Sequence, residues 1–240
     1  MELCYTPFDQ AAQALGIPVA VGEPMSRHTT FQIGGPADRF AAVETLPQLK
    51  ALLQALESQG LPYLVLGKGS NLLVSDKGIR GAVLLLSGEF KAVTLLEDGL
   101  VRAGAGASLA SVCRFVQEHS LTGLEFAWGI PGSVGGAAYM DAGAYGGEMK
   151  DVVERVRHLT PAGGEGEAAG LAVCLPEEPL HRRPGHHHLC GVPPGPWGPG
   201  PDFRPDGGLD GPPQKQAALR YAQRRQRVQA AGGLLRRRPH

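Results

Sequence analysis

Apolar residues recur with a helical period in three stretches of the first 160 residues. In ETLPQLKALLQALESQG the leucines lie at positions 46, 49, 52, 53 and 56. Thr45 is placed as the N-cap and Gly60 as the stop, so a helix is predicted between them. A second helix is predicted after Ser108, in SLASVCRFVQEHS, and a short one over residues 8–16.

Short apolar runs between glycines predict strands. TTFQIGGPADRFAAV is interpreted as strand, turn and strand, and LLVSDKGIRGAVLLL as two strands around a glycine turn. LPYLVL, LVRAGAG and VVERVRHL are each interpreted as one strand. Helices and short strands are mixed and no internal repeat is evident, so the predicted fold class is α+β.

Composition changes near residue 160. From residue 161 onward, 14 glycines and 13 prolines fill 80 positions. Such a segment buries too little apolar area to offset about 1–2 kcal/mol of backbone entropy per residue. We therefore predict an ordered region (1–160), divided into an N-terminal segment (1–27) and a domain (28–160), and a disordered or non-native tail (161–240).

Charge and cysteine usage narrow the functional classes. The formal net charge is zero, so no general affinity for nucleic acid is expected. No apolar run reaches 18 residues, so no membrane partner is expected, and the N-terminus does not resemble a signal peptide. The four cysteines have no ligand spacing and are interpreted as free thiols, which favours the cytoplasm.

The first glycine-rich stretch, VLGKGSNLLVSD, follows a predicted strand. Gly67 and Gly69 permit backbone conformations in which successive N–H groups point into one concavity, which suits phosphate oxygens. Ser70 and Asn71 add side-chain donors. The spacing matches neither the Walker A motif nor the Rossmann GxGxxG motif. A tight turn between two strands is the alternative interpretation.

The second glycine-rich stretch, GIPGSVGGA, is uncharged and has apolar flanks. Pro131 stiffens its entry, and its glycines allow a ligand to approach the backbone closely. Ser133 can donate a hydrogen bond to a phosphate or a ring heteroatom. These features favour a nucleotide-type ligand over an unoccupied surface loop.

Three stretches together carry a family resemblance. TTFQIGGPADRF, VLGKGSNLLVSDKGIRG and GLEFAWGIPGSVGGAAYMDAGAYGGE, in this order, resemble the UDP-N-acetylenolpyruvoylglucosamine reductases over about residues 1–160. The resemblance implies a vanillyl-alcohol-oxidase/PCMH-type FAD-binding fold. It also implies an enzyme that uses FAD, with NADPH as hydride donor, to reduce a UDP-sugar enolpyruvate to UDP-N-acetylmuramate, a peptidoglycan precursor.

The same resemblance implies cofactor-binding residues in both glycine-rich stretches. They are Gly67, Gly69, Ser70, Asn71, Ile130, Gly132, Ser133, Gly135 and Gly136. One position departs from the family's pattern, because Asp141 stands where asparagine is usual. That change removes two donors and adds a charge.

The family's later motifs, which supply an arginine and a proton-donating serine, are not found after residue 160, so no catalytic residue is assigned. Codons can be chosen for residues 174–179 that, read one base later, give Ala-Tyr-Arg-Arg-Ser-Pro, at the place of the family's Tyr-Arg-x-Ser segment. With the same offset, codons can be chosen for residues 222–231, followed by Gly232, that give Pro-Ser-Ala-Gly-Ser-Val-Phe-Lys-Arg-Pro, which contains the family's Ser-Ala-Gly-Ser-x-Phe-Lys segment. We therefore hypothesise that the tail is translated out of frame and that the chain has little or no turnover.

Two other functional outcomes stay open, namely a non-catalytic FAD-binding module and a degenerate product that does not fold. The tail's histidine run, HHH at 186–188, is not expected to bind metal, and its arginine runs are not expected to bind nucleic acid. A reading-frame shift in a GC-rich gene yields such runs freely.

Overall fold

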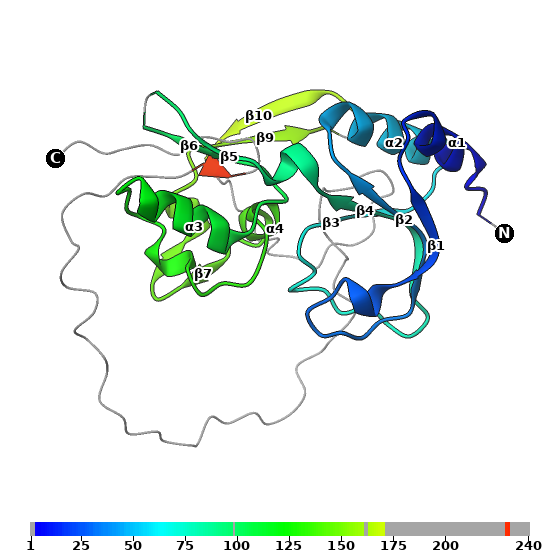
Figure 1. Ribbon diagram of the computed structural model, residues 1–240, viewed down its shortest axis with the longest axis horizontal. Coiled ribbons are helices and arrows are strands. Elements are labelled where there is room, and N and C mark those ends of the chain that lie inside the picture. The colour runs from blue at the N-terminus through cyan, green and yellow to red at the C-terminus, as the bar shows by residue number, and fades with distance from the viewer. Residues whose placement is uncertain (1–2, 98, 161–162, 171–228, 231–240) are drawn as a thin grey trace, which may run out of the picture.

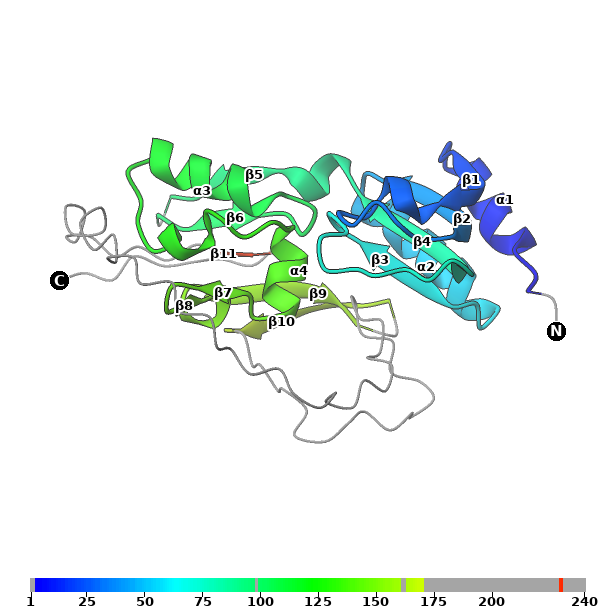
Figure 2. The same ribbon diagram turned by 90° about the horizontal axis from the view of Figure 1, so that it is seen from below.

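The computed structural model describes residues 3–97, 99–160, 163–170 and 229–230. They form two lobes that lie side by side along the long axis of the molecule (Figures 1 and 2). The first lobe contains α1 (Thr6–Ala14), β1 (Val19–Pro24), β2 (Pro36–Val43), α2 (Leu46–Ser58), β3 (Tyr63–Leu66) and β4 (Ile79–Leu86).

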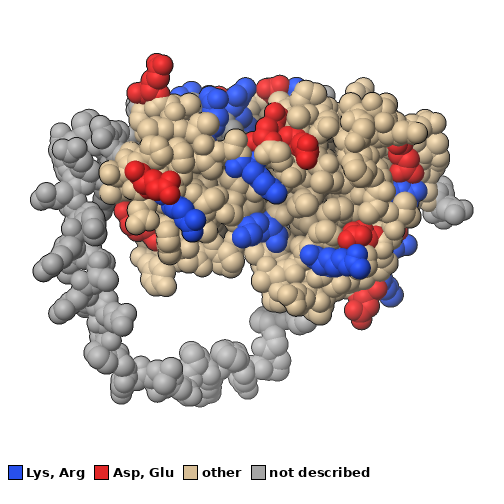
Figure 3. Space-filling view, viewed as in Figure 1, with Lys and Arg blue, Asp and Glu red and all other residues tan. Residues whose placement is uncertain are grey.

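The second lobe is built from shorter elements. It contains β5 (Val93–Leu95), β6 (Val101–Ala103), α3 (Leu109–Glu118), α4 (Val134–Tyr139), β7 (Gly143–Ala144), β8 (Gly147–Glu148), β9 (Arg155–Leu159), β10 (Glu165–Ala169) and β11 (Gln229–Ala230). Charges of both signs are interspersed on the face shown in Figure 3. No helix in the described part of the chain has the length and apolarity needed to cross a membrane.

The first lobe is a four-stranded sheet of order β1-β2-β4-β3. β1 is antiparallel to β2, whereas β2, β4 and β3 run parallel. Residues of α1 and α2 share one apolar cluster with the sheet, and residues including Met25, Leu66 and Val74 form another. Residues 3–27 contribute an edge strand, β1, and a helix, α1, to the first lobe.

The helix at Thr45 is confirmed. The Thr45 hydroxyl accepts a hydrogen bond from the Gln48 amide, and the Gln48 side chain accepts one from the Thr45 amide. This reciprocal cap satisfies two donors that the helix cannot satisfy itself. Gly60 follows the helix with a φ of 61°, as expected of a glycine that ends a helix.

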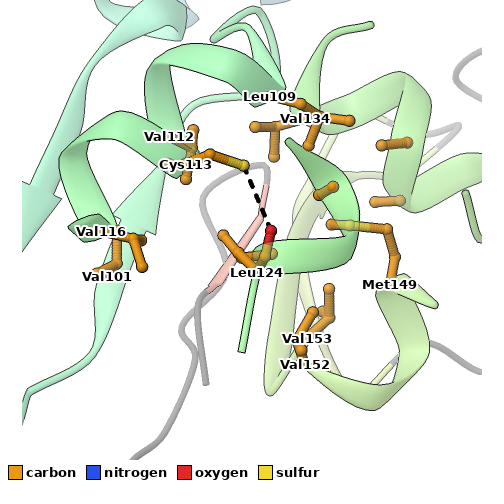
Figure 4. Packing of buried hydrophobic residues seen from close by; sticks show 14 of the residues in the cluster. Val101, Leu109, Val112, Cys113, Val116, Leu124, Val134, Met149, Val152 and Val153 are labelled. Carbon is orange, nitrogen blue, oxygen red and sulfur yellow. Dashed lines mark hydrogen bonds between the residues drawn. The ribbon is translucent and has the colours of Figure 1, made fainter. Parts of the chain in front are cut away.

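The predicted helix after Ser108 is confirmed as well. The Ser108 hydroxyl caps α3 by accepting a hydrogen bond from the Ser111 amide at 3.0 Å. The apolar residues Leu109, Val112, Cys113 and Val116 of α3 are buried against residues of α4 and the segment before β9 (Figure 4). Within this cluster the Cys113 thiol donates to the Leu124 carbonyl at 3.6 Å, and burial raises its pKa to about 11.

Two predicted strands are wrong. Residues 29–33 and 72–76 are fully described but form no strand. They run along each other as connecting segments, with Thr30 N donating to Gly69 O at 3.0 Å and Gly35 N to Ser75 O at 2.9 Å. These two backbone hydrogen bonds are five residues apart along the chain, so they satisfy individual backbone groups but do not form the regular ladder of a β-sheet.

Regular structure also continues past residue 160, where the composition suggested a break. β10 pairs with β9 in an antiparallel hairpin. Its turn is closed by Thr160 N donating to Gly164 O at 2.8 Å, and Gly163 has a φ of 76°. The glycines that lowered the apolar content here therefore also supply the turn that joins two strands.

Candidate functional site

The two glycine-rich stretches meet between the lobes. We call Gly67–Asn71 the first glycine loop and Gly129–Ser133 the second glycine loop. A Cβ atom placed on Gly67 would overlap the Ser133 hydroxyl, and one placed on Gly132 would lie 3.5 Å from Ser70 Oγ. The structure thus brings together residues that are more than 60 positions apart in the sequence.

The first glycine loop is held from behind by backbone. Gly69 has a φ of 61°, and a Cβ atom there would overlap the carbonyl oxygen of His28. His28 itself is fixed by a 2.9 Å hydrogen bond to Glu23 and by stacking on Phe40 at 4.1 Å between ring centroids. Glycine is therefore required at position 69 for both conformation and space.

The amides of the first glycine loop are available for a ligand. Among the described residues, none accepts a hydrogen bond from the backbone N–H groups of residues 67–71. The connection runs from Gly67 to Gly78 before β4 begins, so the alternative of a tight turn between strands is wrong. Consecutive free amides around a left-handed glycine form the kind of concavity that binds anions.

The second glycine-rich stretch has a different structure from the loop that we predicted. Residues from Val134 onward form α4, with Ser133 as the N-cap, so Gly135 and Gly136 lie in its first turn. Gly135 N donates to Ala105 O at 2.9 Å, and Gly136 N donates to Ser133 Oγ at 3.3 Å. Ile130 N donates to Ala127 O at 3.1 Å. These three amides are therefore engaged within the protein.

Three amides of the second glycine loop remain available. Within the described ranges, no acceptor is found for the N–H groups of Gly129, Gly132 and Ser133. Ser133 is buried, and its hydroxyl oxygen accepts from Gly136. The carbonyl of Gly132 accepts from Leu109 N at 3.0 Å, which ties the loop to the start of α3.

A third backbone segment, residues 104–107, was missed as part of the site. We interpreted LVRAGAG only as a strand, but the segment after β6 supplies the carbonyls of Ala105 and Ala107 to Gly135 N and Val134 N. A Cβ atom on Gly106 would lie 2.8 Å from Leu86 O. The alternation of glycine and alanine in AGAGA was the available signal for such close packing.

Several large apolar side chains in or near the glycine-rich stretches of the sequence are exposed. Leu124, Phe126 and Val134 of the apolar flanks are buried in the core of the second lobe, whereas Trp128 and Met140 are about half exposed, at 53% and 54%. Phe31, Ile33, Leu73, Tyr139 and Tyr145 are also exposed.

The unusual Asp141 is accommodated locally. Its backbone has a φ of 44°, a conformation that Asp and Asn adopt more readily than other non-glycine residues. The carboxylate accepts from Lys150 N at 2.8 Å and lies 3.4 Å from Lys150 Nζ. Its negative charge is thus balanced by a neighbouring lysine.

In the part of the chain that the structure describes, no group of three or more His, Cys, Asp or Glu side chains lies close enough together to hold a metal ion. The histidine run at 186–188, the arginine runs and the two stretches that carry the shifted motifs lie outside the described residues, apart from Gln229 and Ala230.

Comparison with known proteins agrees with this geometry. UDP-N-acetylenolpyruvoylglucosamine reductase of Lachnoclostridium phytofermentans is 50% identical over 148 residues, which cover 60% of this chain and 48% of that protein. The protein of the same name from Pelobacter propionicus is 52% identical over 138 residues, covering 58% and 45%. The resemblance predicted from the motifs is therefore confirmed, and the chain spans about half the length of these relatives.

Solved structures give the fold. UDP-N-acetylenolpyruvylglucosamine reductase from Thermus caldophilus matches with a TM-score of 0.52 and 37% identity, over 64% of this chain and 52% of that one. A solvent-stable cholesterol oxidase has a TM-score of 0.53 at 13% identity, over 65% and 34%. The predicted α+β PCMH-type fold is confirmed. Residues 37–167 match the family described as "FAD binding domain". The chain therefore belongs to the FAD-binding-domain family.

Proposed function

We propose that this chain is the FAD-binding part of a UDP-N-acetylenolpyruvoylglucosamine reductase. In this proposal the enzyme uses NADPH to convert UDP-N-acetylglucosamine enolpyruvate to UDP-N-acetylmuramate in the cytoplasm. The proposal is supported by the identity with the reductases over about 60% of the chain and by the match to the FAD-binding domain.

One observation carries the cofactor assignment. The first glycine loop presents the N–H groups of residues 67–71, for which the described residues offer no acceptor, beside the free amides of Gly132 and Ser133. The loops are not basic apart from Lys68, so backbone dipoles supply most of the positive potential. A diphosphate has the charge and the acceptor oxygens to satisfy these donors.

Each predicted residue then has a defined role. The amides of residues 67–71, with Gly132 and Ser133, would hold the diphosphate, and Ser70 and Asn71 would add side-chain donors. Gly135, Gly136 and Ile130 would act indirectly, because their amides are used to fix the start of α4. Exposed apolar side chains such as Trp128 and Met140 would keep water from the cofactor's rings. FAD supplies the redox centre through which a hydride passes to the substrate.

The residues for proton transfer are the second part of the proposal. Without the family's arginine and serine motifs, an enolate formed from the substrate has no assigned stabilising cation or proton donor. We propose that the tail is read out of frame and that the chain binds FAD with little turnover. Determining the nucleotide sequence across codons 155–180 tests the frame, and brisk NADPH oxidation with substrate would contradict the inactivity.

A pair of alanine substitutions tests the cofactor site. In Gly132→Ala the new methyl group meets Ser70 Oγ at 3.5 Å, an ordinary contact, so the protein should fold normally. If a diphosphate lies against this backbone, the methyl group displaces it, and we expect FAD affinity to fall about tenfold or more, roughly 1.4 kcal/mol. Quenching of flavin fluorescence during titration measures the affinity.

Gly129→Ala is the matched control. A Cβ atom there has no protein atom within 4 Å, and residue 129 is not among the predicted cofactor ligands. We expect its FAD affinity to equal that of the unsubstituted chain. Equal affinities for all three proteins would refute the site. A yellow purified chain without reductase activity would favour the non-catalytic FAD-binding module, and a colourless chain without helical circular dichroism would favour the non-folding product.

A further inference from the structure

The first glycine loop rests on residues 28–30, which lie outside both glycine-rich stretches. Thr30 N donates to Gly69 O at 3.0 Å. A Cβ atom on Gly69 would overlap the His28 carbonyl oxygen and lie 3.2 Å from the Cα of Thr29. The loop therefore contacts this segment both through its carbonyl group and through its Cα. A displacement of residues 28–30 would move Gly69 and the free amides on either side of it.

The side chain of His28 connects this segment to the sheet of the first lobe. Its Nε2 lies 2.9 Å from Glu23 Oε1, and its ring stacks on Phe40 with 4.1 Å between centroids and 25° between planes. A carboxylate is an acceptor, so Nε2 is the donor of this hydrogen bond. Glu23 lies in β1 and Phe40 in β2, and these strands pair with each other. The ring thus joins residues 28–30 to two neighbouring strands.

Other hydrogen bonds of the segment are internal to its turn. His28 N donates to Met25 O at 2.9 Å, and the Thr29 hydroxyl donates to Ile33 O at 3.0 Å. Such bonds fix the shape of the turn, whereas the His28 ring fixes the turn against the strands. The His28 side chain is therefore the group whose removal would let the turn shift as a unit.

The pair is shielded from solvent, which increases its effect. The side chains of His28 and Glu23 are only 21% and 19% exposed. Arg27, which lies 3.7 Å from Glu23, is 71% exposed and contributes little on its own. A shielded hydrogen bond to a carboxylate is stronger than one between neutral groups. The bond between His28 and Glu23 is therefore suited to hold a backbone position.

We propose that His28, held by Glu23, is a positioning residue for the binding of FAD. It acts through its own backbone, which supports Gly69, and not by contact with the cofactor. The inference rests on the proposed function, because that function assigns the first glycine loop to the diphosphate. FAD affinity then depends on a hydrogen bond between two side chains that belong to neither glycine loop.

Three substitutions separate the hydrogen bond from the ring. His28→Phe keeps a ring for stacking on Phe40 but cannot donate, Glu23→Leu removes the acceptor, and Glu23→Gln keeps an acceptor oxygen. We expect His28→Phe and Glu23→Leu to lower FAD affinity about tenfold in a flavin fluorescence titration. Glu23→Gln should stay within about twofold of the unsubstituted chain, because its amide oxygen still accepts.

His119→Phe is the matched control. His119 stacks on Phe115 with the same 4.1 Å between centroids, and its Nδ1 lies 2.7 Å from the Phe115 carbonyl oxygen. The substitution removes the same chemistry at the end of α3, in the second lobe, and FAD affinity should not change. Thr45→Ala removes the cap of α2 and controls for a general loss of stability in the first lobe. It should also leave the affinity unchanged.

Combination with Gly69→Ala tests whether His28 acts through the first glycine loop. The methyl group of that variant overlaps the His28 carbonyl, so the loop is already displaced from residues 28–30. We expect His28→Phe to lower FAD affinity less than about twofold further in this background. A general effect on stability would instead lower the affinity about tenfold in both backgrounds.

Exchange of the Thr30 amide, followed by NMR without FAD, reports the contact between the segment and Gly69 directly. It should be about tenfold faster in His28→Phe than in the unsubstituted chain and unchanged in His119→Phe. The inference is overturned if Thr30 exchange does not respond, if both His→Phe variants change FAD affinity equally, or if the effects of His28→Phe and Gly69→Ala are fully additive.

The two readouts separate this inference from the proposed function. A chain that does not bind FAD, but whose Thr30 exchange responds to His28→Phe, would contradict the proposed function and support the positioning of the loop by His28. A chain whose FAD affinity is the same with and without His28→Phe would contradict the positioning role alone.

Discussion

The two glycine-rich stretches at the centre of the molecule use glycine for different physical purposes. In the first glycine loop, Gly69 adopts a left-handed conformation and the described residues offer no acceptor for the neighbouring amides. In the second glycine-rich stretch, Gly135 lets α4 approach residues 104–107, and its amide is bonded to Ala105. We propose that the first supplies donors to a ligand, whereas the second supplies close packing that places a few remaining donors beside them.

The comparison shows that glycine content alone does not identify a phosphate site. What matters is whether the surrounding backbone already satisfies the amides that glycine exposes. Position 69 combines a positive φ, a close backbone neighbour and free amides next to it. Position 135 has the close neighbour without the other two.

Alanine at position 69 should have the largest effect. The methyl group would occupy a left-handed conformation, which costs about 1–2 kcal/mol, and would overlap the His28 carbonyl, so the loop must shift. We expect Gly69→Ala to lower FAD affinity about a hundredfold, as measured by flavin fluorescence titration.

Gly60→Ala provides the control for strain. Gly60 has the same φ of 61°, but no atom lies within 4 Å of a Cβ atom placed there. This variant should lose about 1 kcal/mol of unfolding free energy in urea without a change in FAD affinity. Equal FAD affinities for the two variants would contradict the assignment of the first loop as the donor loop.

Gly135→Ala should separate stability from binding. The methyl group would lie 2.9 Å from the Cβ of Ala105, so α4 must move away, while the amide can still donate to Ala105. We expect a loss of about 1–3 kcal/mol in unfolding free energy and a much smaller change in FAD affinity than in Gly69→Ala. If Gly135→Ala kept its stability but did not bind FAD, the second glycine-rich stretch would serve in binding and not in packing.

Much of this architecture could be predicted because it depends on local signals. Thr45, Gly60 and Ser108 mark helix ends through bonds to their own neighbours, so their positions were correct. The motif resemblance identified both glycine-rich stretches, and the structure brings Gly67 and Ser133 together. The family and the fold could therefore be anticipated from the sequence.

The remaining features depend on contacts between distant segments. LLVSD has the composition of a strand, but it instead runs beside residues 30–35 with a few backbone bonds. The use of the Gly135 amide by Ala105 depends on a segment 30 positions earlier, which a reading of the loop alone cannot reveal. Trp128, which directly precedes the second glycine loop, is half exposed, whereas its apolar neighbours Phe126 and Ala127 are buried.

The reactivity of the Cys113 thiol tests whether α3 holds the second glycine loop in place. Cys113 lies on α3, whose first amide, that of Leu109, holds Gly132, and burial raises the Cys113 pKa from 9.0 to about 11. At pH 8 this lowers the thiolate fraction about a hundredfold relative to an ordinary thiol. In a chain carrying Cys174→Ser and Cys190→Ser, iodoacetamide should modify the exposed Cys4 about a hundredfold faster, as followed by mass spectrometry.

The sign of the pH dependence follows from the same shift. Because the folded state raises the pKa of Cys113, its contribution to stability is fully present below pH 9 and is lost as the pH rises toward 11. Cys113→Ser should therefore reduce the loss of unfolding free energy between pH 9 and 11. Modification of Cys113 as fast as Cys4 at pH 8 would mean that α3 opens readily and does not fix the second loop.

The smallest effect is expected at Asp141. Asp141→Asn keeps the side-chain oxygen that accepts from the Lys150 amide and removes the charge that faces Lys150 Nζ at 3.4 Å. That lysine also pairs with Glu148, so it retains an acidic partner. Asparagine tolerates the left-handed conformation as well as aspartate does.

The thermal midpoint and the FAD affinity of Asp141→Asn should therefore equal those of the unsubstituted chain. Lys150→Ala is the informative companion, because it leaves the Asp141 carboxylate with its backbone bond but without its cation. If Asp141 interferes with a bound diphosphate, Lys150→Ala should weaken FAD binding and Asp141→Asn should strengthen it. A gain in affinity from the asparagine alone would show that the negative charge reaches the cofactor despite the lysine, and would extend the donor surface from the two glycine loops to the turn before β7.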